Sequence, residues 1–155
     1  MKIENKITVL VPFLVVFCFL FVSTGFASSA EIAWVSYDDG MSMVEKNPKK
    51  LFISFYSDRC EYCKVMDEET FKDSAIVSYI NKNFIPVRVN SDKDRKTAEI
   101  FKVRGLPDTW FMSETKEVIG HRPGFISAET LIMVLKYINT NSYKDMSFKS
   151  FVDAH

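Results

Sequence analysis

Two kinds of hydrophobic pattern recur along the chain, one with the spacing of strands and one with the spacing of helices. Leu51–Tyr56 is a nearly continuous run of apolar and aromatic residues, and Phe84–Asn90 alternates, with Ile85, Val87 and Val89 on one side. Runs of this length that are rich in β-branched and aromatic residues are typical of buried strands. The pattern therefore predicts two core strands.

Helical spacing follows each of these strands and returns near the end of the chain. The last helix is the clearest, because four apolar residues stand at i, i+3, i+4 and i+7 after a Ser127 cap: Leu131, Val134, Leu135 and Ile138. The same reasoning predicts helices over residues 38–46, 60–70 and 94–102, and one that Asp73 or Ser74 caps, with Ile76, Val77 and Ile80 on its apolar face.

A hairpin separates the last helix from the rest. The breaker cluster Val103–Pro107 leads into a strand at Thr109–Met112, and a polar turn connects this strand to Glu117–Gly120. A parallel βαβ unit followed by such a hairpin and a closing helix predicts an α/β fold, with a central mixed β-sheet and helices on both faces. We expect one domain over residues 31–140 and a C-terminal tail at 141–155.

Two shorter segments are less defined by their pattern. Residues 32–35 fit either a short first strand or an entry segment, and the tail has room for a short helical turn near residues 148–152. No repeat, low-complexity tract or long Gly, Pro or Ser linker interrupts the chain, which agrees with a single domain.

The first thirty residues have the pattern of an export signal. Lys2 and Lys6 precede the almost wholly apolar stretch Ile7–Val22, and small residues follow, so that cleavage after Ala27 or Ala30 satisfies the small-x-small rule. An uncleaved membrane anchor is the alternative, although the apolar stretch is shorter than the roughly 20 residues that a spanning helix needs. We therefore expect an exported protein.

Charge and cysteine content narrow the function further. The chain has 20 basic and 20 acidic residues, which gives no basic surplus for a nucleic-acid partner. Of its three cysteines, Cys18 lies in the expected leader, so that only Cys60 and Cys63 remain in the domain. A single close pair in an exported domain is more consistent with redox chemistry than with structural cross-linking.

The Cys60–Cys63 pair stands directly after the first core strand and its polar turn. If a helix begins near Cys60, both thiols occupy its first turn, where free backbone N–H groups stabilise a thiolate and lower the pKa of the first cysteine. Arg59 would act in the same direction, whereas Asp58 and Glu61 would oppose it. The sequence leaves this balance open.

These residues resemble the thioredoxin superfamily, in which Cys-x-x-Cys at a strand-to-helix junction is followed by a proline before a later strand. Cys60, Cys63 and Pro107 match this pattern. Glu69–Phe71 and Arg122–Thr130 resemble, more closely, the C-terminal exported domain of bacterial thiol:disulfide interchange reductases of the DsbD type. The resemblance implies a thioredoxin-like fold, thiol–disulfide exchange without a cofactor or metal, and a bacterial periplasmic location.

The resemblance also implies roles for individual residues. Cys60 would be the nucleophile that attacks a client disulfide, and Cys63 would resolve the mixed disulfide. Leu106–Pro107 would form a cis peptide whose neighbouring backbone groups pair with an extended client peptide. The implied partners are client protein disulfides or dithiols and a membrane-bound or soluble electron donor, and the resemblance favours a reductant over an oxidant. We expect the domain to act as a monomer.

Several positions depart from the thioredoxin pattern. Ser54 stands where thioredoxins usually carry a buried Asp, and Asp108 follows the proline where Thr is common. Tyr62 occupies the position before the second cysteine, and we expect Tyr62 and Asp108 to flank the exchange site. These changes affect the potential and the direction of electron flow, not the disulfide chemistry.

Other interpretations of the same residues lead to different functions. A thioredoxin fold can act as a peptide-binding or chaperone-like module that uses the groove beside Pro107 and keeps a dormant disulfide. A zinc site is disfavoured because only His121 and His155 are available as further soft ligands. We interpret His121 as an exposed hairpin residue and the acidic run Asp67–Glu69 as the solvent face of the cysteine helix. Substitution of Cys60 by Ser separates catalysis from simple peptide binding.

Overall fold

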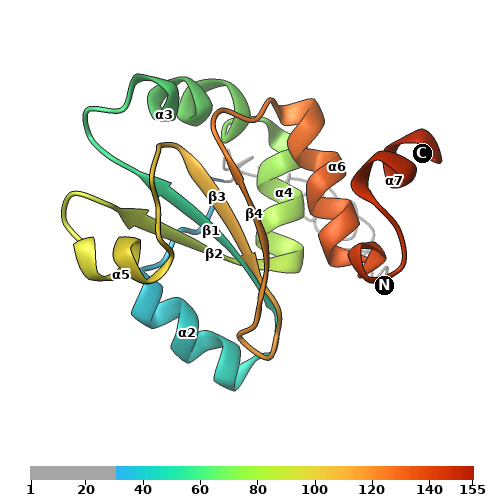
Figure 1. Ribbon diagram of the computed structural model, residues 1–155, viewed down its shortest axis with the longest axis horizontal. Helices are drawn as coiled ribbons and strands as arrows, with labels where there is room; N and C mark the ends of the chain where they lie inside the picture. Colours follow the sequence, from blue (N-terminus) through green and yellow to red (C-terminus); the bar gives the residue numbers. More distant parts are fainter. Residues whose placement is uncertain (1–30) are drawn as a thin grey trace, which may run out of the picture.

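The central element is a four-stranded sheet with strand order β2-β1-β3-β4 (Figure 1). The computed structural model describes residues 31–155, and the expected leader lies outside this range. The strands are β1 (Lys50–Tyr56), β2 (Phe84–Asn90), β3 (Asp108–Met112) and β4 (Val118–Pro123). β1 runs parallel to β2 and antiparallel to β3, and β3 runs antiparallel to β4, so the predicted mixed sheet is confirmed.

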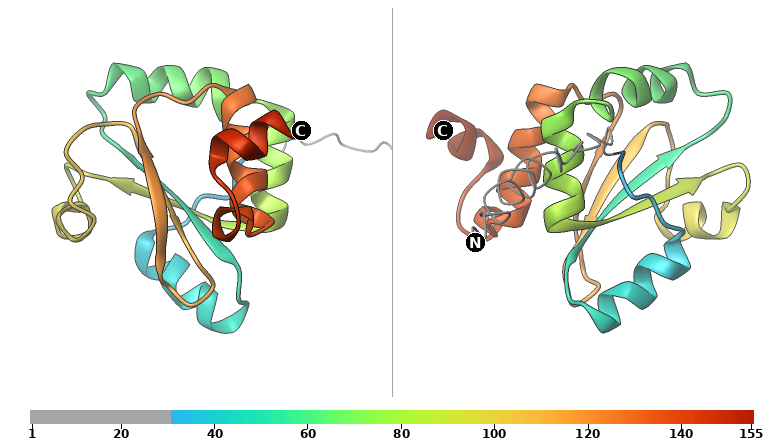
Figure 2. Two further views of the ribbon diagram at one scale, coloured as in Figure 1. Left: turned by 45° about the vertical axis from the view of Figure 1, so that its right-hand side comes forward. Right: turned by 180° about the vertical axis from the view of Figure 1, so that it is seen from behind.

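Helices cover both faces of this sheet, as predicted (Figures 1 and 2). The chain order is α2 (Tyr37–Lys46), β1, α3 (Glu61–Val65), η2 (Met66–Thr70), α4 (Ser74–Asn83), β2, α5 (Arg95–Ile100), β3, β4, α6 (Ala128–Asn139), η3 (Ser142–Lys144) and α7 (Phe148–Asp153). Side-chain caps start most of the helices: Asp73 accepts from the N–H groups of Ala75 and Ile76, and Ser127 accepts from Thr130.

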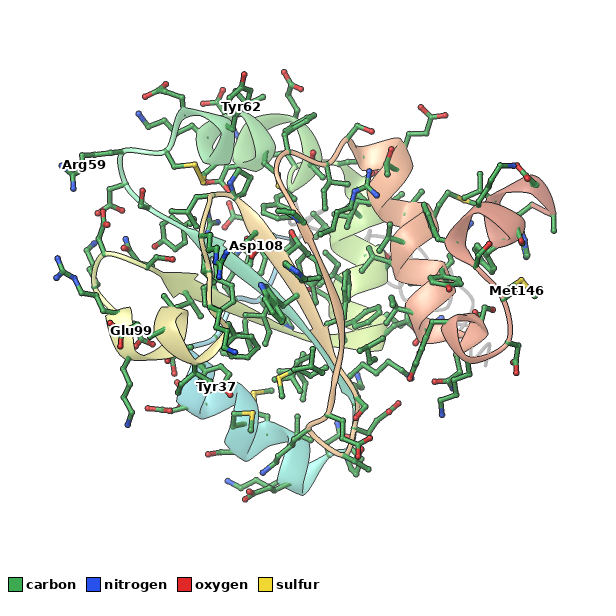
Figure 3. All side chains as sticks on the ribbon, in the orientation of Figure 1. Tyr37, Arg59, Tyr62, Glu99, Asp108 and Met146 are labelled. Carbon is green, nitrogen blue, oxygen red and sulfur yellow. A yellow bond between two sulfur atoms is a disulfide. The ribbon has the colours of Figure 1, made fainter. Side chains whose placement is uncertain are left out.

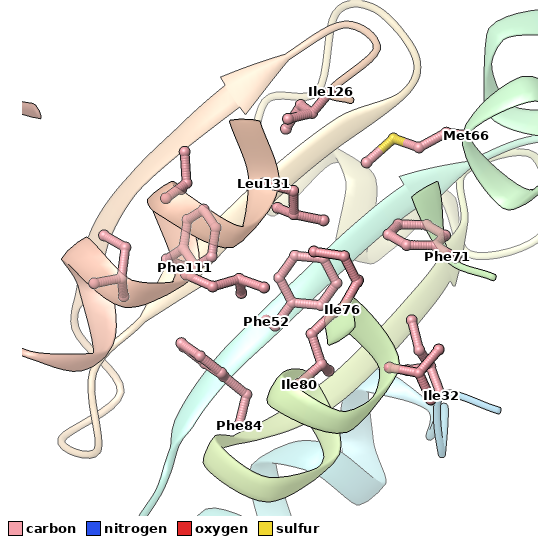
Figure 4. Close-up of a cluster of buried hydrophobic side chains, with 14 residues drawn as sticks. Ile32, Phe52, Met66, Phe71, Ile76, Ile80, Phe84, Phe111, Ile126 and Leu131 are labelled. Carbon is pink, nitrogen blue, oxygen red and sulfur yellow. The ribbon is translucent and has the colours of Figure 1, made fainter. Parts of the chain in front are cut away.

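Strand alternation divides the core into two clusters. On the α4 and α6 side, Phe52, Phe84 and Phe111 from three strands pack against helical residues such as Ile80 and Leu131 (Figure 4). On the α2 and α5 side, the complementary positions of the strands pack against residues of those two helices, in a cluster of Val44, Leu51, Ile53, Phe55, Ile85, Val87, Val89, Phe101 and Met112. Because successive strand residues point to opposite faces, each polar residue in a strand belongs to one of these two sides.

The structure differs from the sequence prediction at two elements. β4 extends to Pro123 instead of ending at Gly120, because Asp108 and Thr109 pair with Pro123 and Arg122. The cysteine helix changes from α-helical to π-helical hydrogen bonding at Met66. Of the two alternatives for residues 32–35, the structure has the entry segment, with a single bridge between residues 35 and 87.

The last fifteen residues fold back onto α6. Tyr137 of α6 has ring contacts with Tyr143, Phe148 and Phe151, and Phe151 is only 3% exposed. The expected tail is therefore a packed extension of the core, with α7 matching the predicted helical turn. None of the helices between residues 31 and 155 has the length and apolarity that a membrane crossing requires.

Candidate active site

Cys60 and Cys63 form a disulfide at the junction between β1 and α3 (Figure 3). Their sulfur atoms are 2.09 Å apart, and their Cα atoms are 5.2 Å apart. Cys60 follows the carboxyl end of β1. Hydrogen bonds with β2 and β3 hold β1 on both sides, so the position of this end is fixed. The two cysteines that the sequence singles out are therefore joined as a redox pair would be.

The two sulfur atoms have different surroundings. Cys60 is the N-cap of α3 and is partly exposed, whereas Cys63 lies inside the helix and is 3% exposed. The backbone N–H of Cys63 donates to Cys60 Sγ across 3.1 Å. In the reduced protein such a donor stabilises a thiolate on Cys60, so that Cys60 is the sulfur suited to attack and Cys63 the one suited to resolve.

The charged residues next to the cysteines are paired with residues of opposite charge. Arg59 is 89% exposed and lies 3.8 Å from Asp92, and Glu61 accepts from Lys64 at 2.9 Å. Asp58 accepts from Lys93, and this hydrogen bond raises the pKa of the Lys93 ammonium. Because these charges largely cancel in pairs, the backbone N–H of Cys63 is the more direct influence on the Cys60 sulfur.

The loop that leads into β3 lies beside the start of α3 in all views (Figures 1 and 2). Pro107 is buried, and the Leu106–Pro107 peptide bond is cis. The carbonyl of Pro107 accepts from the N–H of Gly124, which ties the loop to the end of β4. Within residues 31–155, neither backbone group of Leu106 has a hydrogen-bond partner, so both are available to a ligand.

The two residues expected to flank the exchange site lie in contrasting positions. Tyr62 is 68% exposed and points away from the sheet on α3, whereas Asp108 is 3% exposed at the start of β3 (Figure 3). The Asp108 carboxylate accepts from Trp110 Nε1 at 2.9 Å and contacts His121 Nδ1 at 3.0 Å. His121 is about half-exposed, as expected for a hairpin residue. The sequence did not predict its contact with Asp108.

Below the cysteine helix, one row of side chains crosses three strands. Ser54 pairs with Arg88 on β2 and with Thr109 on β3, and all three side chains face α4 and α6. Arg88 Nη2 lies 2.6 Å from both carboxylate oxygens of Asp67 in η2, and Arg88 Cζ lies 4.2 Å from the Tyr56 ring centroid. Asp67 is therefore not simply part of the solvent face, as the sequence suggested.

The signal for this ion pair was present in the sequence. Arg88 is the one charged residue in a mostly apolar strand, and such a residue needs a partner when the strand is buried. What the sequence did not provide was the partner, because Asp67 is 21 positions away. Among residues 31–155, no group of three or more His, Cys, Asp and Glu side chains could hold a metal ion.

Comparisons with known proteins agree with this geometry. A family model described as a thioredoxin-like domain matches residues 37–139. The thiol:disulfide interchange protein DsbD of Campylobacter jejuni (strain RM1221) is 36% identical over 92 residues, which cover 57% of this chain and 16% of that protein. The chain thus spans only a small part of the length of this relative.

Solved structures resemble the fold at low sequence identity. A thioredoxin from Thermus thermophilus matches with a TM-score of 0.64 and 18% identity over 70% of this chain and 87% of that chain. A thioredoxin-fold protein from Helicobacter pylori matches with a TM-score of 0.61 and 18% identity over 83% of this chain and 94% of that chain. The family model therefore shows that the chain belongs to the thioredoxin-like family, and its Cys-x-x-Cys residues are joined by a disulfide.

Proposed function

We propose that this protein is an exported thiol–disulfide oxidoreductase that reduces disulfides in client proteins. The observation that carries the proposal is the unequal environment of the two cysteines: Cys60 is accessible and accepts the Cys63 N–H, and Cys63 is buried behind it. Similarity to DsbD, which is named as a thiol:disulfide interchange protein, supports thiol–disulfide exchange. The reducing direction rests on the resemblance of the sequence motifs and is part of the proposal.

The reaction proceeds in two exchange steps. The Cys60 thiolate attacks one sulfur of the client disulfide, that S–S bond breaks, and the departing client thiolate takes up a proton. Cys63 then loses its proton and attacks Cys60 Sγ, which forms the Cys60–Cys63 disulfide and releases the second client thiolate. Two electrons pass from the protein to the client, and a dithiol donor, membrane-bound or soluble, restores the reduced state.

The client would lie along the loop beside the disulfide. The free backbone N–H and C=O of Leu106 can pair with an extended peptide, as strand-addition binding requires. The exposed Tyr62 ring, next to Cys63 on α3, offers an apolar contact to the client. The leader pattern and the similarity to DsbD support a bacterial periplasmic location, and we propose that the domain acts as a monomer.

The cysteine variants test the mechanism. Incubation of reduced Cys63→Ser protein with a disulfide-bonded client should accumulate a mixed disulfide at Cys60, whereas Cys60→Ser should form none and lose all reductase activity. Thiol trapping followed by mass spectrometry measures both results. If Cys60→Ser kept full activity toward clients, or if clients bound equally well with no exchange in the wild type, the protein would be a peptide-binding module instead.

The equilibrium reduction potential tests the direction. Titration against dithiothreitol and glutathione buffers should give a value near that of thioredoxin, about −270 mV. A value near that of a strong oxidant, about −120 mV, would mean that the protein oxidises client dithiols.

A further inference from the structure

A pocket of about 470 Å³ opens beside the loop that the proposed function assigns to client binding. Gly105 and Asp108, which flank Leu106–Pro107 on either side, both line it. A peptide that pairs with the backbone of Leu106 would therefore pass the mouth of this pocket. A side chain of that peptide near its disulfide is the group best placed to enter.

One wall of the pocket is held rigidly. The Trp110 and His121 rings stack with centroids 4.1 Å apart, and both rings contact the buried Asp108 carboxylate through their nitrogen atoms. The Asp108 carboxylate therefore interacts with these two rings and not with the open part of the pocket. His121 Nδ1 faces Asp108, and Nε2 has no hydrogen-bond partner within the described residues.

The charges that remain free in the pocket are positive. Lys102 and Arg104 line it from the segment between α5 and β3, and both are exposed. Neither forms an ion pair with any residue between 31 and 155.

Exposed acidic side chains lie further along the cysteine helix. Glu68 and Glu69 of η2 are exposed and form no ion pair in the described part of the chain. A client carboxylate would be repelled near these residues and attracted near Lys102 and Arg104. The protein can therefore discriminate between client peptides by the position of their acidic residues.

We propose that this pocket selects client peptides that carry an acidic side chain next to the disulfide-bonded cysteine. The carboxylate would lie between Lys102 and Arg104, with the stem of the side chain against the Trp110–His121 wall. This inference rests on the proposed function and adds its substrate class.

Two peptide disulfides that differ in one residue provide the test. One carries Glu beside its cysteine and the other Gln, and the rate of each with dithiothreitol corrects for intrinsic reactivity. We expect the reduced wild-type protein to prefer the Glu peptide by about fivefold in kcat/KM at low salt, the size expected for two exposed charge contacts. The preference should shrink in 0.5 M salt because exposed charges are screened.

Variants locate the preference. K102Q/R104Q should reduce the Gln peptide at the wild-type rate but lose the preference for Glu. K72Q/K136Q, which removes two exposed cations that do not line the pocket, should keep this preference.

Equal rates for both peptides in the wild type, or an equal loss for both in K102Q/R104Q, would overturn this inference and leave the proposed reductase standing. Oxidised glutathione as the only substrate sensitive to K102Q/R104Q would also overturn it, because the pocket would then serve a small acidic disulfide and not a client peptide. If the wild type reduced neither peptide, the proposed function would fail, and this inference with it.

Discussion

The two ends of the central sheet differ in whether their buried polar groups have hydrogen-bond partners. At the end where β1 begins, Lys50 is 3% exposed, and its Nζ donates to Glu114 across 2.7 Å. At the end where β1 leads to the disulfide, three polar atoms are buried without a hydrogen-bond partner among residues 31–155: Arg88 Nε, Ser91 Oγ and Thr109 Oγ1. At the first end the buried ammonium group has a partner, whereas at the second end three buried polar atoms have none in the described part of the chain.

We infer from this difference that the first end is shaped by stability and the second by the proposed thiol chemistry. A buried polar group without a partner costs about 1–3 kcal/mol of folding free energy. Proteins commonly tolerate such costs at functional sites. The row of Arg88, Ser54 and Thr109 lies under the cysteine helix, where an apolar surface would pack more stably. We infer that polarity is kept there because the thiol chemistry occurs above it.

Removal of Arg88 should have the largest effect on the active-site end. Its guanidinium is 20% exposed, pairs with Asp67 and lies over the Tyr56 ring, so Arg88→Ala loses packing and leaves a carboxylate unpaired. We expect the free energy of unfolding to fall by about 3 kcal/mol in urea titrations. Asp67→Asn, which keeps a hydrogen-bond acceptor, should cost only about 1 kcal/mol. A cost below about 0.5 kcal/mol for Arg88→Ala would mean that this end is not held by the ion pair.

At the opposite end of the sheet, substitution of Glu114 should cost more stability than substitution of its partner Lys50. Glu114→Ala leaves the Lys50 ammonium buried and unpaired, for which we expect a loss of about 2 kcal/mol. Lys50→Met keeps the volume and leaves Glu114, which is 42% exposed, accessible to water, so its cost should stay within about 1 kcal/mol. Urea unfolding at pH 7 measures both. Equal costs would contradict the view that burial of Lys50 dominates this pair.

Replacement of Thr109 by Val should give a smaller change of the opposite sign. The two side chains have nearly the same shape, and the Thr109 hydroxyl has no partner within the described part of the protein. We therefore expect Thr109→Val to stabilise the fold by up to about 1 kcal/mol. A clear loss of stability in urea unfolding would show that the hydroxyl does have a partner in solution. The reductase assay on the same sample measures whether activity falls as stability rises.

The pH dependence of the Lys50–Glu114 end should give the smallest effect. Burial raises the pKa of the Glu114 carboxyl, but the hydrogen bond from Lys50, a backbone hydrogen bond and the charges of Lys50 and Lys144 together lower it by more, so its net pKa lies below the ordinary value. A lowered folded-state pKa contributes stability above the unfolded pKa of about 4.3, and this contribution is lost as pH falls through the folded value. We expect wild-type stability to drop more than that of Lys50→Met between pH 6 and pH 3. Parallel curves for the two proteins would contradict this assignment.

The sequence alone determined the features that depend on neighbouring residues. The alternation in Phe84–Asn90 and the helical stripe that ends at Ile138 record local periodicity, and both elements formed as predicted. Cys60 and Cys63 needed only a strand-to-helix junction to become neighbours, because three positions along a helix bring side chains together. The fold class and the disulfide were therefore predictable.

Tertiary structure alone decided the polar pairs around this framework. Asp108 meets His121 across 13 positions, Arg88 meets Asp67 across 21, and Lys50 meets Glu114 across 64. Each pair depends on the register of two strands or on where a helix crosses the sheet, and a shift by one residue would turn a strand side chain to the other face. Local patterns contain no record of such crossings. The sequence could therefore predict the disulfide, but not which charged side chains would pair with each other.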